Sequence, residues 1–289
     1  MKRESKKINH ITSGIFRLSF LCFIVMVIYC QSVSALDLLG PPAAEIKKWQ
    51  PVIGIEYSHS TMDKGLINGT WQDEVFGESP TSGLVKDLTL SDLEMDKLNV
   101  YLGYGIERDW EIFFRLGAAK SKFGDTLFHQ NERFDSDYVP SIGGGLRATF
   151  ITDRKLKIGA IVQADWTQYT GLLSSSLWAN PAFVRMDLEN IHAAAGALYQ
   201  WTKGISIYGG PVCTYGIGGF ETDFITLSVD NDNVTHIVTT KYKWDIEKKF
   251  DYGAYVGAQI DLDKDFSMNV EYQMTGDTKV FGAGIVWKF

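Results

Sequence analysis

The sequence predicts an all-β fold, a transmembrane antiparallel up-and-down β-barrel of about ten strands with both termini in the periplasm. Three observations favour this fold. Apolar residues alternate with polar or small ones along segments of roughly 9–11 residues, the length of a tilted membrane strand. Short turns alternate with long connections. The chain ends, over residues 278–289, on a strand with aromatic residues on one face, which lipid would cover.

The first 35 residues have the composition of a secretory signal peptide. Four basic residues near the start are followed by an apolar run over residues 18–30 and by the small residues 33–35. That run of about thirteen apolar residues is shorter than the roughly 20 that a membrane-spanning helix needs. We therefore expect signal peptide over 1–35, a periplasmic N-terminal leader over 36–48 and the barrel over 49–289.

Charge and cysteine usage fit this placement. The net charge is −7, and removal of the signal peptide, with five basic residues and one acidic residue, makes it −11. Such an acidic chain argues against a nucleic-acid partner. Cys22 and Cys30 lie in the signal peptide, so Cys213 remains without an intrachain disulfide partner. A barrel needs no disulfide, because its closed hydrogen-bond ladders stabilise it.

Ten segments carry the strand pattern. In the first, Ile53 and Tyr57 face outward while Glu56 faces inward. The clearest hairpin joins the second and third segments across a three-residue turn, because the apolar positions continue on one face on both sides of it. Similar short turns follow the fourth, sixth and eighth segments. The ten segments are 49–59, 98–106, 110–118, 138–150, 156–166, 191–201, 205–217, 252–262, 266–274 and 278–289.

The long connections are expected at the extracellular end. Residues 60–95 and 218–249 are predicted to be long outer loops, and 222–229 and 234–244 form a hairpin that projects into water. Residues 170–188 form a less polar loop that could fold over the barrel mouth.

Aromatic residues sort into two levels when the strands are laid side by side. Such girdles mark the two membrane interfaces, and a soluble sandwich has no reason to produce them. One girdle consists of Trp110, Phe150, Trp201, Phe266 and Trp287 at the short-turn end, and the other of Tyr57, Tyr138, Trp166, Tyr215 and Tyr252.

The last strand also resembles an assembly signal. Phe281, Ile285, Trp287 and the terminal Phe289 match the C-terminal pattern of the small Gram-negative outer-membrane β-barrel superfamily, of the OmpA transmembrane-domain and opacity-protein type. With the signal peptide and the strand ladder, the resemblance covers nearly the whole chain. It implies an outer-membrane monomer that contacts membrane lipid and lipopolysaccharide and that meets the barrel assembly machinery through its C-terminal strand.

The resemblance leaves the task open, because members of that superfamily serve adhesion, envelope support, narrow pores or hydrolysis. An omptin-type protease would present an Asp-x-His unit at the outer rim, and the sequence has none. Asp165 and His192 both point inward near the outer rim and form a possible pair, although such a pair is more often structural. A lipid-A deacylase would need a lipid-facing Ser and His, and neither is expected on the outward faces.

No catalytic residue, metal site or cofactor is assigned. Asp230 and Asp232 are of the residue type that binds divalent cations, but turn formation explains both residues without a metal. In the narrow lumen, Glu56, Arg115, Arg147 and Glu271 are predicted to lie at similar heights and to form a charge network that plugs the barrel, because unpaired buried charges are costly.

The expected function is that of a non-enzymatic envelope protein with a plugged lumen, which acts through its outer loops or as a narrow pore. A rim-site hydrolase is the alternative.

Overall fold

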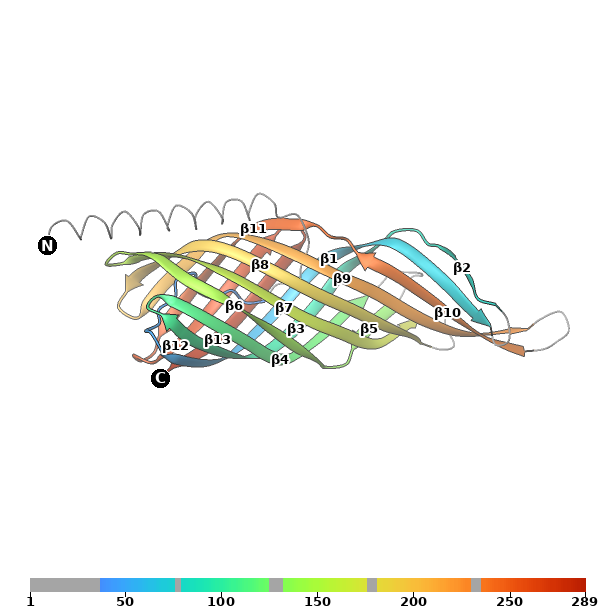
Figure 1. Ribbon diagram of the computed structural model, residues 1–289, viewed down its shortest axis with the longest axis horizontal. Coiled ribbons are helices and arrows are strands. Elements are labelled where there is room, and N and C mark those ends of the chain that lie inside the picture. Colours follow the sequence, from blue (N-terminus) through green and yellow to red (C-terminus); the bar gives the residue numbers. More distant parts are fainter. Residues whose placement is uncertain (1–36, 76–78, 125–131, 176–180, 230–234) are drawn as a thin grey trace.

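The computed structural model describes residues 37–75, 79–124, 132–175, 181–229 and 235–289 (Figure 1). The predicted signal peptide, Leu36 and the turn residues Asp230 and Asp232 lie outside these ranges. In the described part of the chain, no helix is long and apolar enough to cross a membrane.

Within these described ranges, thirteen strands make up one antiparallel sheet. They are β1 (Pro51–Val75), β2 (Thr81–Leu84), β3 (Leu88–Glu107), β4 (Trp110–Gly124), β5 (Glu132–Ser136), β6 (Val139–Thr152), β7 (Leu156–Ser175), β8 (Ala182–Thr202), β9 (Ile205–Val229), β10 (Thr235–Ile246), β11 (Phe250–Asp261), β12 (Phe266–Thr275) and β13 (Thr278–Lys288).

Ten of these strands close into a ring. Following the pairings, the order is β1, β3, β4, β6, β7, β8, β9, β11, β12 and β13, and β13 returns to β1. The seam between the first and last strands is continuous from Val52 opposite Lys288 to Met62 opposite Thr278. The predicted antiparallel barrel of about ten strands is confirmed, and the ring has no free edge.

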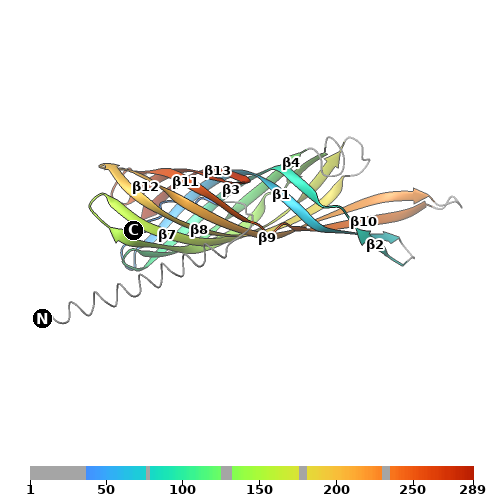
Figure 2. The same cartoon turned by 90° about the horizontal axis from the view of Figure 1, so that it is seen from above.

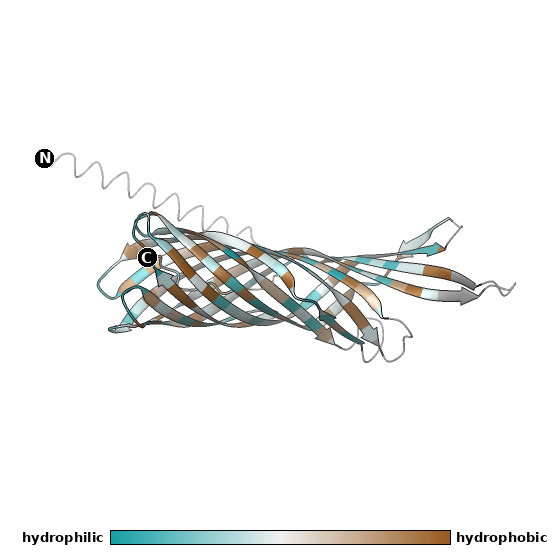
Figure 3. Cartoon of the chain, turned by 90° about the horizontal axis from the view of Figure 1, so that it is seen from below, coloured by the Kyte–Doolittle hydropathy of each residue, from teal (hydrophilic) through white to brown (hydrophobic). Residues whose placement is uncertain are grey.

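The outer face of the ring is apolar. Along β1, exposed Ile53, Ile55 and Tyr57 alternate with buried Glu56 and Ser58. Figure 3 shows apolar bands repeating along the barrel strands. The girdle residues Trp110, Phe150, Trp201 and Trp287 at one end, and Tyr57, Tyr138, Trp166 and Tyr252 at the other, are all at least 41% exposed. An exposed apolar surface of this extent is the wall of a transmembrane barrel.

The barrel continues beyond the ends of β11, β12 and β13. There it closes through eight strands, β1, β3, β4, β5, β7, β8, β9 and β10, with β10 bridging β9 and β1. We call this part the outer extension. Figures 1 and 2 show β1, β2, β9 and β10 reaching farthest from the ring, as a flat ribbon.

The outer extension corrects the prediction of long loops at 60–95 and 170–188, because most of these residues lie in strands. Within 218–249 the expected projecting hairpin is confirmed, since β9 and β10 pair from Gly219 opposite Asp245 to Val229 opposite Thr235. The reason for the correction is an inverted pattern. In the ring the apolar residues face lipid, whereas in the extension they face inward and form a core. That core contains Met62, Leu66, Leu90, Leu93, Met95, Ala119, Phe123, Phe134, Val139, Tyr169, Leu173, Ala182, Val184, Met186, Leu188, Phe220, Trp244 and Ile246, and we call it the apolar cap.

The expected leader outside the barrel is also corrected. Residues 37–46, which we call the lumen segment, lie inside the ring, where Leu38 and Leu39 are 2% and 0% exposed. Glycines in the barrel wall leave the space that this segment occupies, because they carry no side chain. A Cβ on Gly282 would lie 2.6 Å from Leu38 Cδ1, and a Cβ on Gly159 would lie 2.3 Å from the Pro42 carbonyl oxygen. The lumen is therefore filled by a piece of backbone as well as by wall side chains.

Candidate functional site

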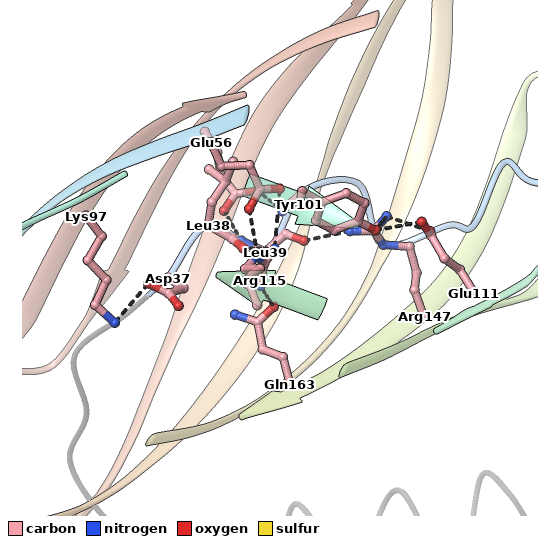
Figure 4. A network of polar contacts seen from close by, with 12 residues as sticks. Asp37, Leu38, Leu39, Glu56, Lys97, Tyr101, Glu111, Arg115, Arg147 and Gln163 are labelled. Atoms are coloured by element: carbon pink, nitrogen blue, oxygen red, sulfur yellow. Dashed lines mark hydrogen bonds and ion pairs between the residues drawn. The ribbon is translucent and has the colours of Figure 1, made fainter. Parts of the chain in front are cut away.

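The candidate site is the lumen with its segment, and Arg115 of β4 is at its centre (Figure 4). Arg115 is 2% exposed. Its Nε donates to Glu56 Oε2 at 2.6 Å, its Nη1 to Gln163 Oε1 at 2.7 Å, and its Nη2 to the Leu38 carbonyl oxygen at 2.7 Å. One guanidinium thus connects β1, β4 and β7 to the lumen segment.

Arg147 of β6 makes a parallel connection. Its Nη1 donates to Glu111 Oε2 at 2.9 Å and its Nη2 to the Leu39 carbonyl oxygen at 3.0 Å. The Tyr101 hydroxyl donates a hydrogen bond to the other carboxylate oxygen, Glu111 Oε1, at 2.6 Å. The Phe113 ring lies under Arg147, with the guanidinium carbon 5.4 Å from the ring centroid, and supports it by a cation–π contact.

Glu271 of β12 faces the backbone of the lumen segment. Its two carboxylate oxygens accept hydrogen bonds from the backbone amides of Leu39 and Gly40, each at 2.9 Å. Gln273 Nε2 also donates a hydrogen bond to Oε1, at 2.7 Å. Within the described residues, Glu271 has no Arg or Lys in salt-bridge range. The predicted four-residue network is therefore corrected. Glu56 and Arg115 meet, Arg147 pairs with Glu111, and Glu271 holds the segment.

A second polar layer lies toward the apolar cap. His192 Nε2 lies 3.0 Å from Asp165 Oδ1, while Lys97 Nζ and Asn190 Nδ2 donate to Asp165 Oδ2 at 2.9 and 2.8 Å. Lys97 also reaches Asp37 Oδ1 at 3.0 Å. The predicted Asp165–His192 pair is present, but the side chains are 3% and 0% exposed. The pair is enclosed in the barrel and is not open at a rim.

The other end of the lumen segment is held near the short turns. Lys157 Nζ pairs with Glu45 Oε1 at 2.5 Å, and Gln259 Nε2 donates to Glu45 Oε2 at 3.1 Å. The Thr149 hydroxyl donates to the Ala44 carbonyl oxygen at 3.0 Å. A cavity of about 50 Å³ lies beside the segment, a volume for only a few water molecules.

Sequence reasoning missed one group on the outward face. His59 lies there, half-exposed, with Nδ1 2.9 Å from Asp96 Oδ1, and the Tyr57 hydroxyl donates to the same oxygen at 2.7 Å. This corrects the expectation that the lipid-facing side carries no His. In the described part of the chain no serine is hydrogen-bonded to the His59–Asp96 pair, so the Ser–His arrangement of a lipid-A deacylase does not form there.

The partners of the lumen segment were also missed, because hydrogen bonds from side chains to a backbone leave no sequence pattern. The one available signal was the row of inward glycines, such as Gly159 and Gly282, which leave space that wall side chains do not fill.

Comparison with known proteins finds outer-membrane β-barrels among the solved structures. The outer-membrane protease OmpT from Escherichia coli shares 9% identity, with 85% of this chain and 99% of that chain covered and a TM-score of 0.41. The β domain of the Bordetella autotransporter BrkA shares 10%, covering 82% and 99%, with a TM-score of 0.41. The attachment invasion locus protein Ail of Yersinia pestis shares 11%, covering 84% and 99%, with a TM-score of 0.31. No protein-family model and no curated protein matches the chain.

Proposed function

We propose that the chain is a non-enzymatic outer-membrane protein whose lumen is closed and whose outer extension is its working surface. The signal peptide sends it across the inner membrane, and the C-terminal strand engages the assembly machinery. The apolar wall then contacts membrane lipid and lipopolysaccharide around a monomer. With the short turns in the periplasm, the outer extension faces the outside of the cell.

The observation that carries this proposal is the double closure of the barrel. The lumen segment fills the ring, and the apolar cap fills the outer extension above it. Packed apolar side chains leave no path for hydrated solutes. The enclosed Asp165–His192 pair likewise has no path to a substrate, so the geometry favours neither a pore nor a rim-site hydrolase.

The ribbon of β2, β1, β10 and β9 supplies the surface for a partner. Its outward face carries ion pairs between Lys241 and Glu74 at 2.9 Å and between Lys243 and Glu221 at 2.6 Å. A groove of about 470 Å³ runs between them and is lined by Gln72, Leu84 and Asp223. Burial raises the pKa of the Asp223 carboxyl, against the opposing effect of the Lys241 ammonium.

Exposed apolar residues accompany these charges. Leu84, Ile225 and Ile237 are 86%, 58% and 58% exposed on the ribbon, away from the apolar wall of the ring. A surface of mixed charged and aliphatic residues on a sheet is suited to binding a macromolecule.

The test is to shorten the ribbon and measure attachment. Residues 222–242 are replaced by an Asn-Gly turn, and cells carrying the full chain, the shortened chain or neither are compared for attachment to protein-coated and polysaccharide-coated surfaces and to one another. We expect the full chain to increase attachment and the shortened chain to match cells without the protein. Equal attachment by full and shortened chains, at equal surface amounts, would contradict the proposal.

A further inference from the structure

We propose that the lumen is a peptide-binding site, that residues 37–46 are its resident ligand, and that the barrel accepts the same peptide when it is no longer covalently attached. The class of ligand is an extended acidic peptide with the pattern Asp-Leu-Leu-Gly. This inference depends on the contacts inside the ring and not on the cellular location or the role of the outer extension.

The wall recognises the segment in the way that a receptor recognises a peptide. Side chains of the strands bond to the segment's backbone. Glu271 accepts two consecutive amides, Arg115 and Arg147 donate to two consecutive carbonyl oxygens, and Gln273 donates to the Asp37 carbonyl oxygen at 2.9 Å. Charge-assisted hydrogen bonds of this kind are among the stronger ones in proteins.

The site also selects particular side chains. Leu38 lies against the bare backbone of Gly282, and Leu39 lies among the aromatic and aliphatic residues of the lumen wall. Gly40 has a φ of +75°, and a Cβ there would lie 3.0 Å from Arg147 Nη2. A side chain at this position would therefore meet both an unfavourable backbone conformation and the guanidinium. The Leu-Leu-Gly order is thus matched to the wall.

Charge fixes the two ends of the ligand. The carboxylate of Asp37 pairs with the buried ammonium of Lys97, and the carboxylate of Glu45 pairs with Lys157. The two lysines lie on different strands and at opposite ends of the segment. A peptide that lacks either acid would leave a buried or half-buried cation with fewer partners.

The ring closes without the segment. Each of the ten wall strands pairs with its two neighbours, and the seam between β1 and β13 joins only wall residues. The segment is attached to β1 through residues 47–50, where Lys47, Lys48 and Trp49 are exposed. Site and ligand are therefore joined by one accessible linker that a protease can reach.

The experiment uses the full chain with a protease recognition sequence inserted between Lys47 and Lys48. The folded protein is cleaved in detergent and offered a fluorescent synthetic peptide of residues 37–46. One sample is exchanged directly, and another is denatured, freed of its own segment and refolded with the peptide. Peptide bound to the barrel is measured by fluorescence anisotropy and by co-elution in size-exclusion chromatography.

We expect saturable binding that excess unlabelled peptide displaces. Peptides with Gly40→Val or with a scrambled order of the same residues should bind at least tenfold more weakly. The inference is overturned if the labelled peptide enters the barrel neither by exchange nor on refolding, or if the scrambled peptide binds equally well.

Discussion

Glu271 shows how the lumen depends on single residues. Glu271 is 1% exposed, and its carboxylate accepts hydrogen bonds from two backbone amides of the lumen segment and from the Gln273 side-chain amide. Loss of these acceptors leaves buried donors without partners, and each such donor costs about 1–3 kcal/mol. The residue therefore stabilises the closed state through the segment and not through an arginine.

We expect Glu271→Ala to lower the free energy of unfolding by roughly 2–6 kcal/mol, because the backbone amides of Leu39 and Gly40 both lose their acceptor. Urea unfolding of the refolded protein in lipid vesicles measures this change. Glu107→Ala is the matched control, because Glu107 is exposed and its pair with Lys48 at 2.7 Å, screened by solvent, adds little to stability. Equal stability of the two variants would contradict the role assigned to Glu271.

We expect Phe289 to matter for assembly and not for the stability of the folded barrel. It is 60% exposed and contacts Trp287, with ring centroids 4.5 Å apart, so it adds little to packing. We expect its deletion to lower the yield in the outer membrane severalfold while the refolded protein keeps its thermal stability. Immunoblots of membrane fractions, beside thermal melts in detergent, separate the two effects, and an unchanged membrane yield would remove Phe289 from the signal.

At the scale of elements, the strands of the ring were predictable and the outer extension was not. In β1 the inward positions change from Glu56 and Ser58 to Met62 and Leu66, so the apolar face turns from lipid to core along one strand. A pattern search that expects apolar residues outside interprets the second half as a loop. The Glu56–Arg115 pair was predictable, because counting along the strands places both residues at a similar height in the lumen. The contacts of Glu271 were not predictable, because they depend on where the lumen segment lies.

The apolar cap makes the outer extension a folded element with its own core. Trp244 of β10 is fully buried against Phe220 of β9, with ring centroids 6.0 Å apart. We expect Trp244→Ala to destabilise the extension by about 3–5 kcal/mol, the usual cost of a large cavity. Limited proteolysis should then cut β10 while the ring stays intact. Ile225→Ala, at a position 58% exposed, is the control and should leave the digestion pattern unchanged.

For the whole molecule, we propose a direction in the membrane from the positions of the short turns. We expect an epitope tag at Lys203, in the short turn between β8 and β9, to be reached by antibody only after permeabilisation. A tag at Leu84, which is 86% exposed on the ribbon, should be labelled on intact cells. Labelling at Lys203 on intact cells would reverse the orientation and place the ribbon in the periplasm.

The whole barrel is closed at two levels, by the lumen segment within the ring and by the apolar cap in the extension. Single-channel recording in planar lipid bilayers tests this claim most directly. We expect the full chain to insert without conductance steps. A variant lacking residues 37–46 and carrying Phe134→Ala, Phe220→Ala and Trp244→Ala should show steps, because both levels are then opened. Stable open-channel conductance from the full, unaltered chain would contradict the closed barrel.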